Sequence, residues 1–175
     1  MDTVGYEMYC KILEEVIKEE RGVGVGDLDN PPEIEITIDI DVSSYIPDGF
    51  IDNDSGKIEI YQNIALCKTE EDIENVIDEI LDRFGTMPKE VENLLDIARI
   101  KNLCRKLGII KVMQKRQSIV FNFNNSLFNI DIVDKLVKEY KNKIMFSPSA
   151  EPYLIYKIDD TEKVLNEIKT FLENF

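Results

Sequence analysis

Apolar residues recur at helical spacing in two consecutive segments, 70–84 and 88–107, which are joined by a tight corner. In the first segment they lie at intervals of three and four residues, which predicts one apolar stripe on an amphipathic helix: Ile73, Val76, Ile77, Ile80, Leu81 and Phe84. Thr69 can cap this helix and Asp72 completes a capping box. Gly85 is suited to end it, because glycine adopts a positive φ without steric cost. Pro88 suits the first turn of the next helix.

The second of these helices has apolar residues on more than one stripe, so we expect it to pack against partners on two sides. Gly108 ends its pattern. Before the pair, the pattern predicts an amphipathic helix at 9–21, a flexible link from Gly22 to Pro32, and a strand at 33–42. That strand alternates apolar with acidic residues. A turn rich in apolar residues follows at 45–51.

After Gly108 the pattern changes to strand–strand–helix, repeated twice with a period of roughly 35 residues. The expected strands are 109–113, 119–123, 143–146 and 153–158, and the helices are centred on 132–140 and 164–172. We therefore predict an α+β fold. A helical N-terminal half with one strand, residues 1–108, precedes a four-stranded antiparallel sheet with two helices on one face, residues 109–175.

Charge and composition narrow the possible functions. The 175 residues carry 21 Lys and Arg against 35 Asp and Glu, a net charge of −14, and include no histidine. Such a chain repels phosphate backbones, which disfavours direct nucleic-acid binding. It also lacks the commonest general base and metal ligand. No apolar run is long enough for a membrane span and no leader is evident, so we expect a cytoplasmic protein.

The search for catalytic or ligand-binding motifs favours structural interpretations. The alternate glycines after Gly22 follow a predicted helix and lack the spacing of a dinucleotide loop. The aspartates at alternate positions of segment 52–57 suggest a calcium loop, but the glycine comes one position too early and the closing acidic residue is missing. A helix N-cap explains this segment better. Cys10, Cys67 and Cys104 lie among apolar positions, which predicts reduced, buried thiols. Lys157 and Asp159 are not linked to any pocket, and we expect neither catalysis nor a cofactor.

The most informative surface is the polar side of the 70–84 helix. It carries five acidic residues followed by Arg83: Glu71, Glu74, Asp78, Glu79 and Asp82. Neighbouring like charges at helical spacing are mildly destabilising. They form either a solvated face that aids solubility or a docking surface for arginines, which bind carboxylates in directional, salt-sensitive pairs.

Several segments, in this order and spacing, resemble the C-terminal domain of the bacterial transcription-repair coupling factor (Mfd, TRCF). The resemblance extends from about Val4 to Gly108 and is weaker beyond it. It rests on segments 4–15, 57–61 and 94–101, on Tyr45-Ile-Pro-Asp-Gly-Phe-Ile and on Leu81-Asp-Arg-Phe-Gly-Thr-Met-Pro.

The resemblance implies a regulatory domain of an ATP-driven DNA translocase that displaces stalled RNA polymerase and recruits UvrA for excision repair. In that family this domain folds back on a UvrB-like module of the same protein and masks the surface that UvrA needs. The family's acidic contact positions fall here on Glu79 and Asp82. We predict an interdomain contact formed by Asp78, Glu79, Asp82 and Arg83.

Two other functions are compatible with the residues alone. One is a free-standing acidic adaptor or nucleic-acid mimic that blocks a basic surface. The other is a small hydrolase that uses carboxylates, which would need a cleft with two converging acids.

Overall fold

The structure is a computed structural model that describes residues 36–125 and 130–175. Its described residues form two compact units. Residues 42–98 form the helical unit, and residues 36–41 together with 99–125 and 130–175 form the sheet unit. The two units divide within one continuous helix, between Ala98 and Arg99. Gly108, where the sequence analysis placed the boundary, follows the end of that helix with φ of 69°. The predicted helix at 9–21 and the glycine-rich link lie outside the described residues.

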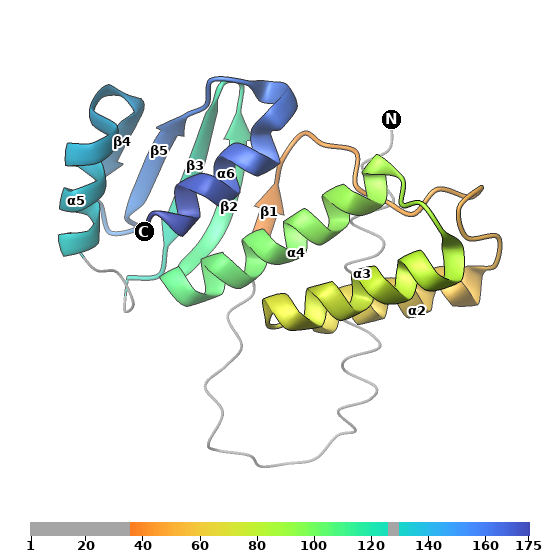
Figure 1. The fold of residues 1–175 in the computed structure, drawn as a ribbon. Coiled ribbons are helices and arrows are strands. Elements are labelled where there is room, and N and C mark those ends of the chain that lie inside the picture. Colours follow the sequence, from red (N-terminus) through yellow and green to blue (C-terminus); the bar gives the residue numbers. More distant parts are fainter. Residues whose placement is uncertain (1–35, 126–129) are drawn as a thin grey trace, which may run out of the picture. The chain divides into compact units, whose positions relative to one another are not determined.

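The helical unit consists of α2 (Asp54–Leu66), α3 (Glu70–Phe84) and the first half of α4 (Lys89–Leu107), as Figure 1 shows. The ends of these helices match the sequence prediction. The Thr69 side chain accepts a hydrogen bond from the Asp72 N–H while the Asp72 carboxylate accepts from the Thr69 N–H, which completes the capping box. Gly85 follows α3 with φ of 81°.

The core of the helical unit is formed by residues that recur at helical spacing on all three helices, by Cys67 directly after α2, and by two residues of the turn before α2. Its members are Ile46, Ile51, Ile60, Ile64, Cys67, Ile73, Val76, Ile80, Val91, Leu94, Leu95 and Ala98. The turn is held by hydrogen bonds as well, since the Ile46 N–H donates to the Tyr61 hydroxyl at 2.9 Å and the Asn93 side chain donates to the Ser43 carbonyl at 2.8 Å.

Residues 52–57 form a helix cap, as the sequence predicts. The Asn53 side chain accepts a hydrogen bond from the Gly56 N–H at the start of α2. Gly56 is needed there because a Cβ on it would lie 2.7 Å from the Asn53 side-chain oxygen. The competing calcium-loop interpretation therefore has no support in this turn.

The sheet unit contains a five-stranded mixed sheet with the order β1-β2-β3-β5-β4. Its strands are β1 (Thr37–Asp39), β2 (Ile109–Lys115), β3 (Ser118–Phe123), β4 (Ile144–Ser147) and β5 (Tyr153–Lys157). The four strands after Gly108 pair antiparallel, as predicted. The predicted count of four is one too low, because β1, which the pattern assigns to the helical half, pairs parallel with β2.

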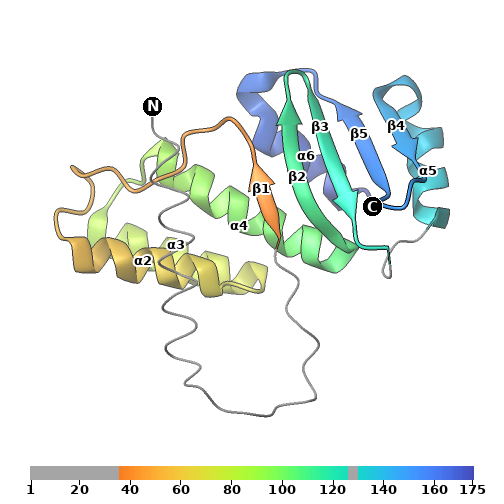
Figure 2. The same ribbon diagram turned by 180° about the vertical axis from the view of Figure 1, so that it is seen from behind.

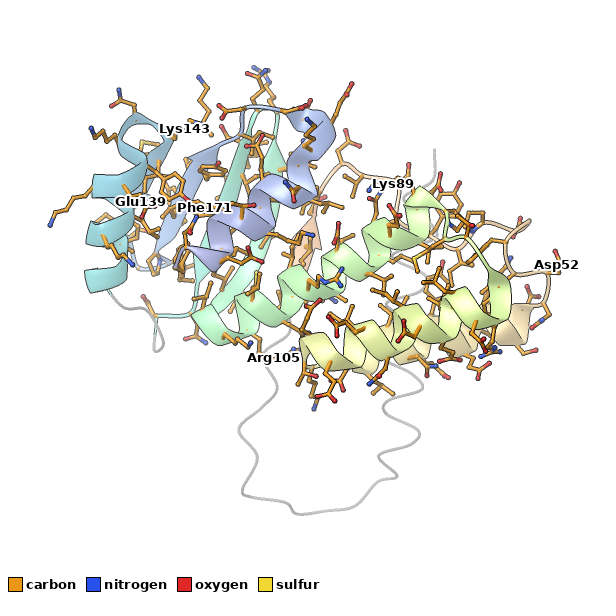
Figure 3. All side chains as sticks on the ribbon, in the orientation of Figure 1. Asp52, Lys89, Arg105, Glu139, Lys143 and Phe171 are labelled. Atoms are coloured by element: carbon orange, nitrogen blue, oxygen red, sulfur yellow. The ribbon has the colours of Figure 1, made fainter. Side chains whose placement is uncertain are left out.

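Both remaining helices cover the same face of this sheet. They are α5 (Ile130–Tyr140), followed by the short helix η1 (Lys141–Lys143), and α6 (Val164–Glu173), preceded by η2 (Thr161–Lys163). Tyr140 of α5 and Phe171 of α6 both pack on Tyr156 of β5, with ring centroids 5.9 and 4.3 Å away. Figure 3 shows Phe171 between its helix and the strands, so one aromatic cluster joins both helices to the sheet.

Candidate functional site

The acidic side of α3 is exposed along its whole length. We define the acidic face of α3 by five exposed residues: Glu71, Glu74, Asp78, Leu81 and Asp82. The four acidic residues follow one another at intervals of three or four, and Leu81 lies three residues after Asp78. At 1.5 Å rise per residue, this face extends over about 16 Å. Asp78 and Asp82 form no hydrogen bond or ion pair with residues 36–125 or 130–175. Their carboxylates are thus available to an external cation.

Glu79 and Arg83, which the prediction groups with these aspartates, instead belong to an internal network between α2 and α3. Arg83 pairs with Glu79 one turn before it and with Glu59 of α2, the latter at 3.0 Å. The second carboxylate oxygen of Glu79 accepts a hydrogen bond from the Asn63 side chain of α2 at 3.1 Å. Glu79 therefore has this chain's own partners at both oxygens.

The network also accounts for the electrostatics around Arg83. The hydrogen bonds that Arg83 donates to Glu59 and Glu79 raise the pKa of Arg83, and the bond accepted by Glu59 lowers the pKa of that carboxylate. The guanidinium carbon lies 4.9 Å from the centre of the Phe84 ring, within the range of a cation–π contact. Arg83 is paired with Glu59 and Glu79 and forms no ion pair with Asp82 within the described residues.

The structure thus divides the four predicted contact residues into two groups. Asp78 and Asp82 lie one turn apart on the exposed side of the helix. Glu79 and Arg83 bind each other beside α2. The role of all four in an interdomain contact stays a prediction.

Leu81 is a surface residue that the sequence pattern misassigns. The apolar stripe predicts its burial, but Leu81 is 47% exposed, whereas its neighbour Ile80 is fully buried. Ile73, Val76 and Ile80 fill the buried side of the helix, so the angular position of Leu81 turns it out toward Asp78 and Asp82. The sequence did hold a sign of this exposure. Leu81 directly follows Ile80, so it is turned away from the centre of the apolar stripe and lies at its margin.

The chemistry available at this site is the binding of cations and of apolar surface. Among the described residues, no group of three or more His, Cys, Asp or Glu side chains is placed to hold a metal ion.

Cys67 and Cys104 are free and buried, as predicted, and Cys10 lies outside the described residues. Burial raises the pKa of the Cys67 thiol to about 11 and that of Cys104 to about 12. No helix in the described part of the chain is both long and apolar enough to cross a membrane.

Three comparisons relate the chain to known proteins. The family model of the TRCF domain matches residues 40–131. The transcription-repair-coupling factors of Staphylococcus epidermidis and Staphylococcus haemolyticus are 39% and 36% identical to the chain over 119 residues. Those residues are 68% of this chain and 10% of each relative, so the chain spans about a tenth of the length of these curated relatives.

A solved structure supports the fold. The crystal structure of the C-terminal domain of transcription-repair coupling factor aligns with a TM-score of 0.71 at 24% identity, covering 80% of this chain and 91% of that one. This similarity establishes the shared α+β architecture. The family model matches more than half of the residues and shows the family: the chain belongs to the TRCF domain family.

Proposed function

We propose that this chain is the C-terminal regulatory domain of a cytoplasmic transcription-repair coupling factor. The whole protein would use ATP to translocate on DNA, displace stalled RNA polymerase and recruit UvrA for nucleotide excision repair. In this proposal the domain is autoinhibitory: it covers the UvrB-like module of the same protein, and so competes with UvrA without binding it.

The observation that carries the proposal is the pair of exposed carboxylates of Asp78 and Asp82 beside exposed Leu81. Arginines of the covered module would bind the two carboxylates, because a guanidinium forms paired, directional hydrogen bonds with a carboxylate. Leu81 would supply the apolar contact at the centre of the interface.

Glu79 and Arg83 take a supporting role in this proposal. Their pairing with each other and with Glu59 and Asn63 holds α3 against α2, which keeps the acidic face of α3 in a fixed position. A rigid docking surface loses less conformational entropy when it binds.

The energetics suit a contact that has to be released. Exposed ion pairs contribute only about 0.2–1 kcal/mol each, so two pairs and one half-exposed leucine make a weak clamp. A competing ligand can open such a clamp if it binds the open state more tightly by a similar free energy.

The test uses the full-length parent protein with Asp78→Lys and Asp82→Lys. We expect this variant to bind UvrA without the activating signal that the wild type requires, since reversed charges repel the arginines of the covered module. The matched control is Glu151→Lys with Glu173→Lys, which changes the net charge equally on exposed residues of the sheet unit. Circular dichroism checks that the domain remains folded.

Two further results distinguish the roles of the residues. Leu81→Ser should also unmask UvrA binding, and without any change of charge. If UvrA binding stays masked in the aspartate variant while the domain is folded, the acidic face of α3 is not the contact surface.

A further inference from the structure

The sheet of the sheet unit has one face that no described helix covers. The register of the strands places Ile38, Val112, Phe121, Leu154 and Phe146 on the face beneath α5 and α6. Along each strand, the residues next to these point to the opposite side of the sheet, which we call the open face. Figure 2 shows this side, with β2 and β3 in front of α6.

A continuous apolar row crosses the open face. Met113 of β2, Val120 of β3, Ile155 of β5 and Met145 of β4 are consecutive partners in the strand register. Val120 is buried in the middle of the row, Met113 and Ile155 are partly exposed, and Met145 on the edge strand is 59% exposed. The row therefore presents apolar surface with two adaptable methionine side chains.

Lysines border this row on both sides. Lys111 lies two residues before Met113, and Lys115 and Lys157 lie two residues beyond the row on β2 and β5. All three lysines are exposed. None of them has an ion-pair partner within the described ranges of the chain. Asp39 on β1 is the acidic residue in register with the row.

The distribution of charge over the described residues makes this border significant. The sheet unit (36–41, 99–125 and 130–175) contains 14 Lys and Arg against 11 Asp and Glu, a net charge of +3. The helical unit (42–98) contains 4 Lys and Arg against 14 Asp and Glu, a net charge of −10. The sheet unit is thus slightly basic whereas the helical unit is strongly acidic, and the lysines beside the row favour an acidic partner for the open face.

We infer that the open face is a second interaction surface, which binds an acidic amphipathic helix of a partner protein. Four adjacent strands span three intervals of about 4.8 Å, so the row is about 14 Å long. About ten helical residues cover that length at 1.5 Å each. Apolar residues at positions i, i+3 or i+4, and i+7 of this helix would contact the row.

Acidic residues on both flanks of the helix would then reach the lysines, which lie about 7 Å from the row at two residues along a strand. Single-stranded nucleic acid fits the face less well, because the row is aliphatic and thioether and Tyr153 is the one aromatic residue that the described strands place on this face. Sheets that bind single strands stack successive bases on several aromatic rings. This surface is separate from the acidic face of α3 and does not depend on the proposed function.

The test measures binding of the whole chain to a fluorescein-labelled 16-residue peptide by fluorescence anisotropy. The peptide is a designed helix with leucines at i, i+3, i+4 and i+7 and glutamates on both flanks. The variants are Lys115→Glu with Lys157→Glu, and Met145→Glu. The matched control, Lys138→Glu with Lys163→Glu, reverses two exposed charges on α5 and η2, away from the open face.

We expect each of the two open-face variants to weaken peptide binding by about fivefold to thirtyfold, while the control binds like the wild type. A peptide with lysines in place of the glutamates should not bind. Lys115→Gln with Lys157→Gln repeats the test with a milder change if the reversal lowers the melting temperature.

Four results would overturn the inference. They are absence of peptide binding at millimolar concentration, equal binding by the wild type and both open-face variants, tighter binding of a labelled single-stranded oligonucleotide, and a concentration-dependent dimer that the double lysine reversal abolishes. The last, measured by light scattering, would identify a second copy of this chain as the occupant.

Discussion

Phe171 holds the sheet unit together, and shortening it should destabilise that unit strongly. Its side chain is 1% exposed. The ring stacks on Tyr156 and Phe121 with centroids 4.3 and 5.4 Å away, and it meets Tyr140 edge-on at 5.1 Å. These partners come from β5, β3 and α5, so a single residue of α6 joins three other elements.

The size of the effect follows from burial and from the ring contacts. Truncation of a buried phenylalanine to alanine costs about 3–5 kcal/mol, because apolar burial is lost and a cavity remains. Each aromatic pair adds about 0.5–1.5 kcal/mol beyond its buried area. Phe171→Ala should therefore fall at the upper end of that range. Phe171→Leu retains much of the apolar volume and should cost less than Phe171→Ala, about 1.5–4.5 kcal/mol if the three ring contacts are lost.

The assay is urea unfolding followed by circular dichroism, with hydrogen exchange to locate the change. With a slope of about 2 kcal/mol per molar urea, a loss of 4 kcal/mol lowers the midpoint by about 2 M. Phe175→Ala is the matched control, because Phe175 contacts Phe171 and Phe123 but is only partly buried. A loss below about 2 kcal/mol for Phe171→Ala, or one no larger than that of Phe175→Ala, would refute this account of the cluster.

Three further predictions concern the helix cap, its pH dependence and thiol chemistry. Thr69→Ala removes half of the capping box and should cost about 1 kcal/mol in urea unfolding. Hydrogen bonds from the Lys68 and Thr69 N–H groups and from the Thr69 side chain lower the pKa of Asp72 from its ordinary value of 3.8. The Asp72 carboxylate therefore stabilises the fold fully above pH 3.8, and this stabilisation is lost as the pH falls below that value. Asp72→Asn should therefore make unfolding less pH-dependent between about pH 5 and pH 2, and an unchanged profile would contradict the role of this carboxylate. Cys67 and Cys104 have thiol pKa values of about 11 and about 12, so at pH 8 at most about one-thousandth of either thiol is ionised to thiolate. Peptide mapping after alkylation should therefore find both cysteines labelled in urea and neither labelled in buffer.

Much of the fold is predictable from residues that are close in sequence. The capping box of Thr69 and Asp72 and the stop at Gly85 involve neighbours within four residues, and the structure confirms each. The four strands after Gly108 also follow from the local pattern of residues, although their order in the sheet does not. The family is recognisable for the same reason, because the segments that carry the resemblance keep their spacing along the chain.

The site was less predictable because its geometry depends on pairs that are distant in sequence. Arg83 binds Glu59, 24 residues away, and Glu79 binds Asn63, 16 residues away. Nothing in the spacing of charges along α3 indicates which carboxylates α2 will engage. The exposure of Leu81 was missed because periodicity identifies a stripe but does not determine how wide the buried part of that stripe is.

By itself the sequence determined the described helices and their ends, the strands after Gly108, the acidic character of α3 and the family. These features depend on backbone conformation and on contacts within one helical turn or one strand. The tertiary structure decided that Thr37–Asp39 joins the sheet as a fifth strand, that Glu79 and Arg83 face α2, and that Met113, Val120, Ile155 and Met145 form one row. Such arrangements bring together residues tens of positions apart, and only the packing of whole elements determines which of them meet.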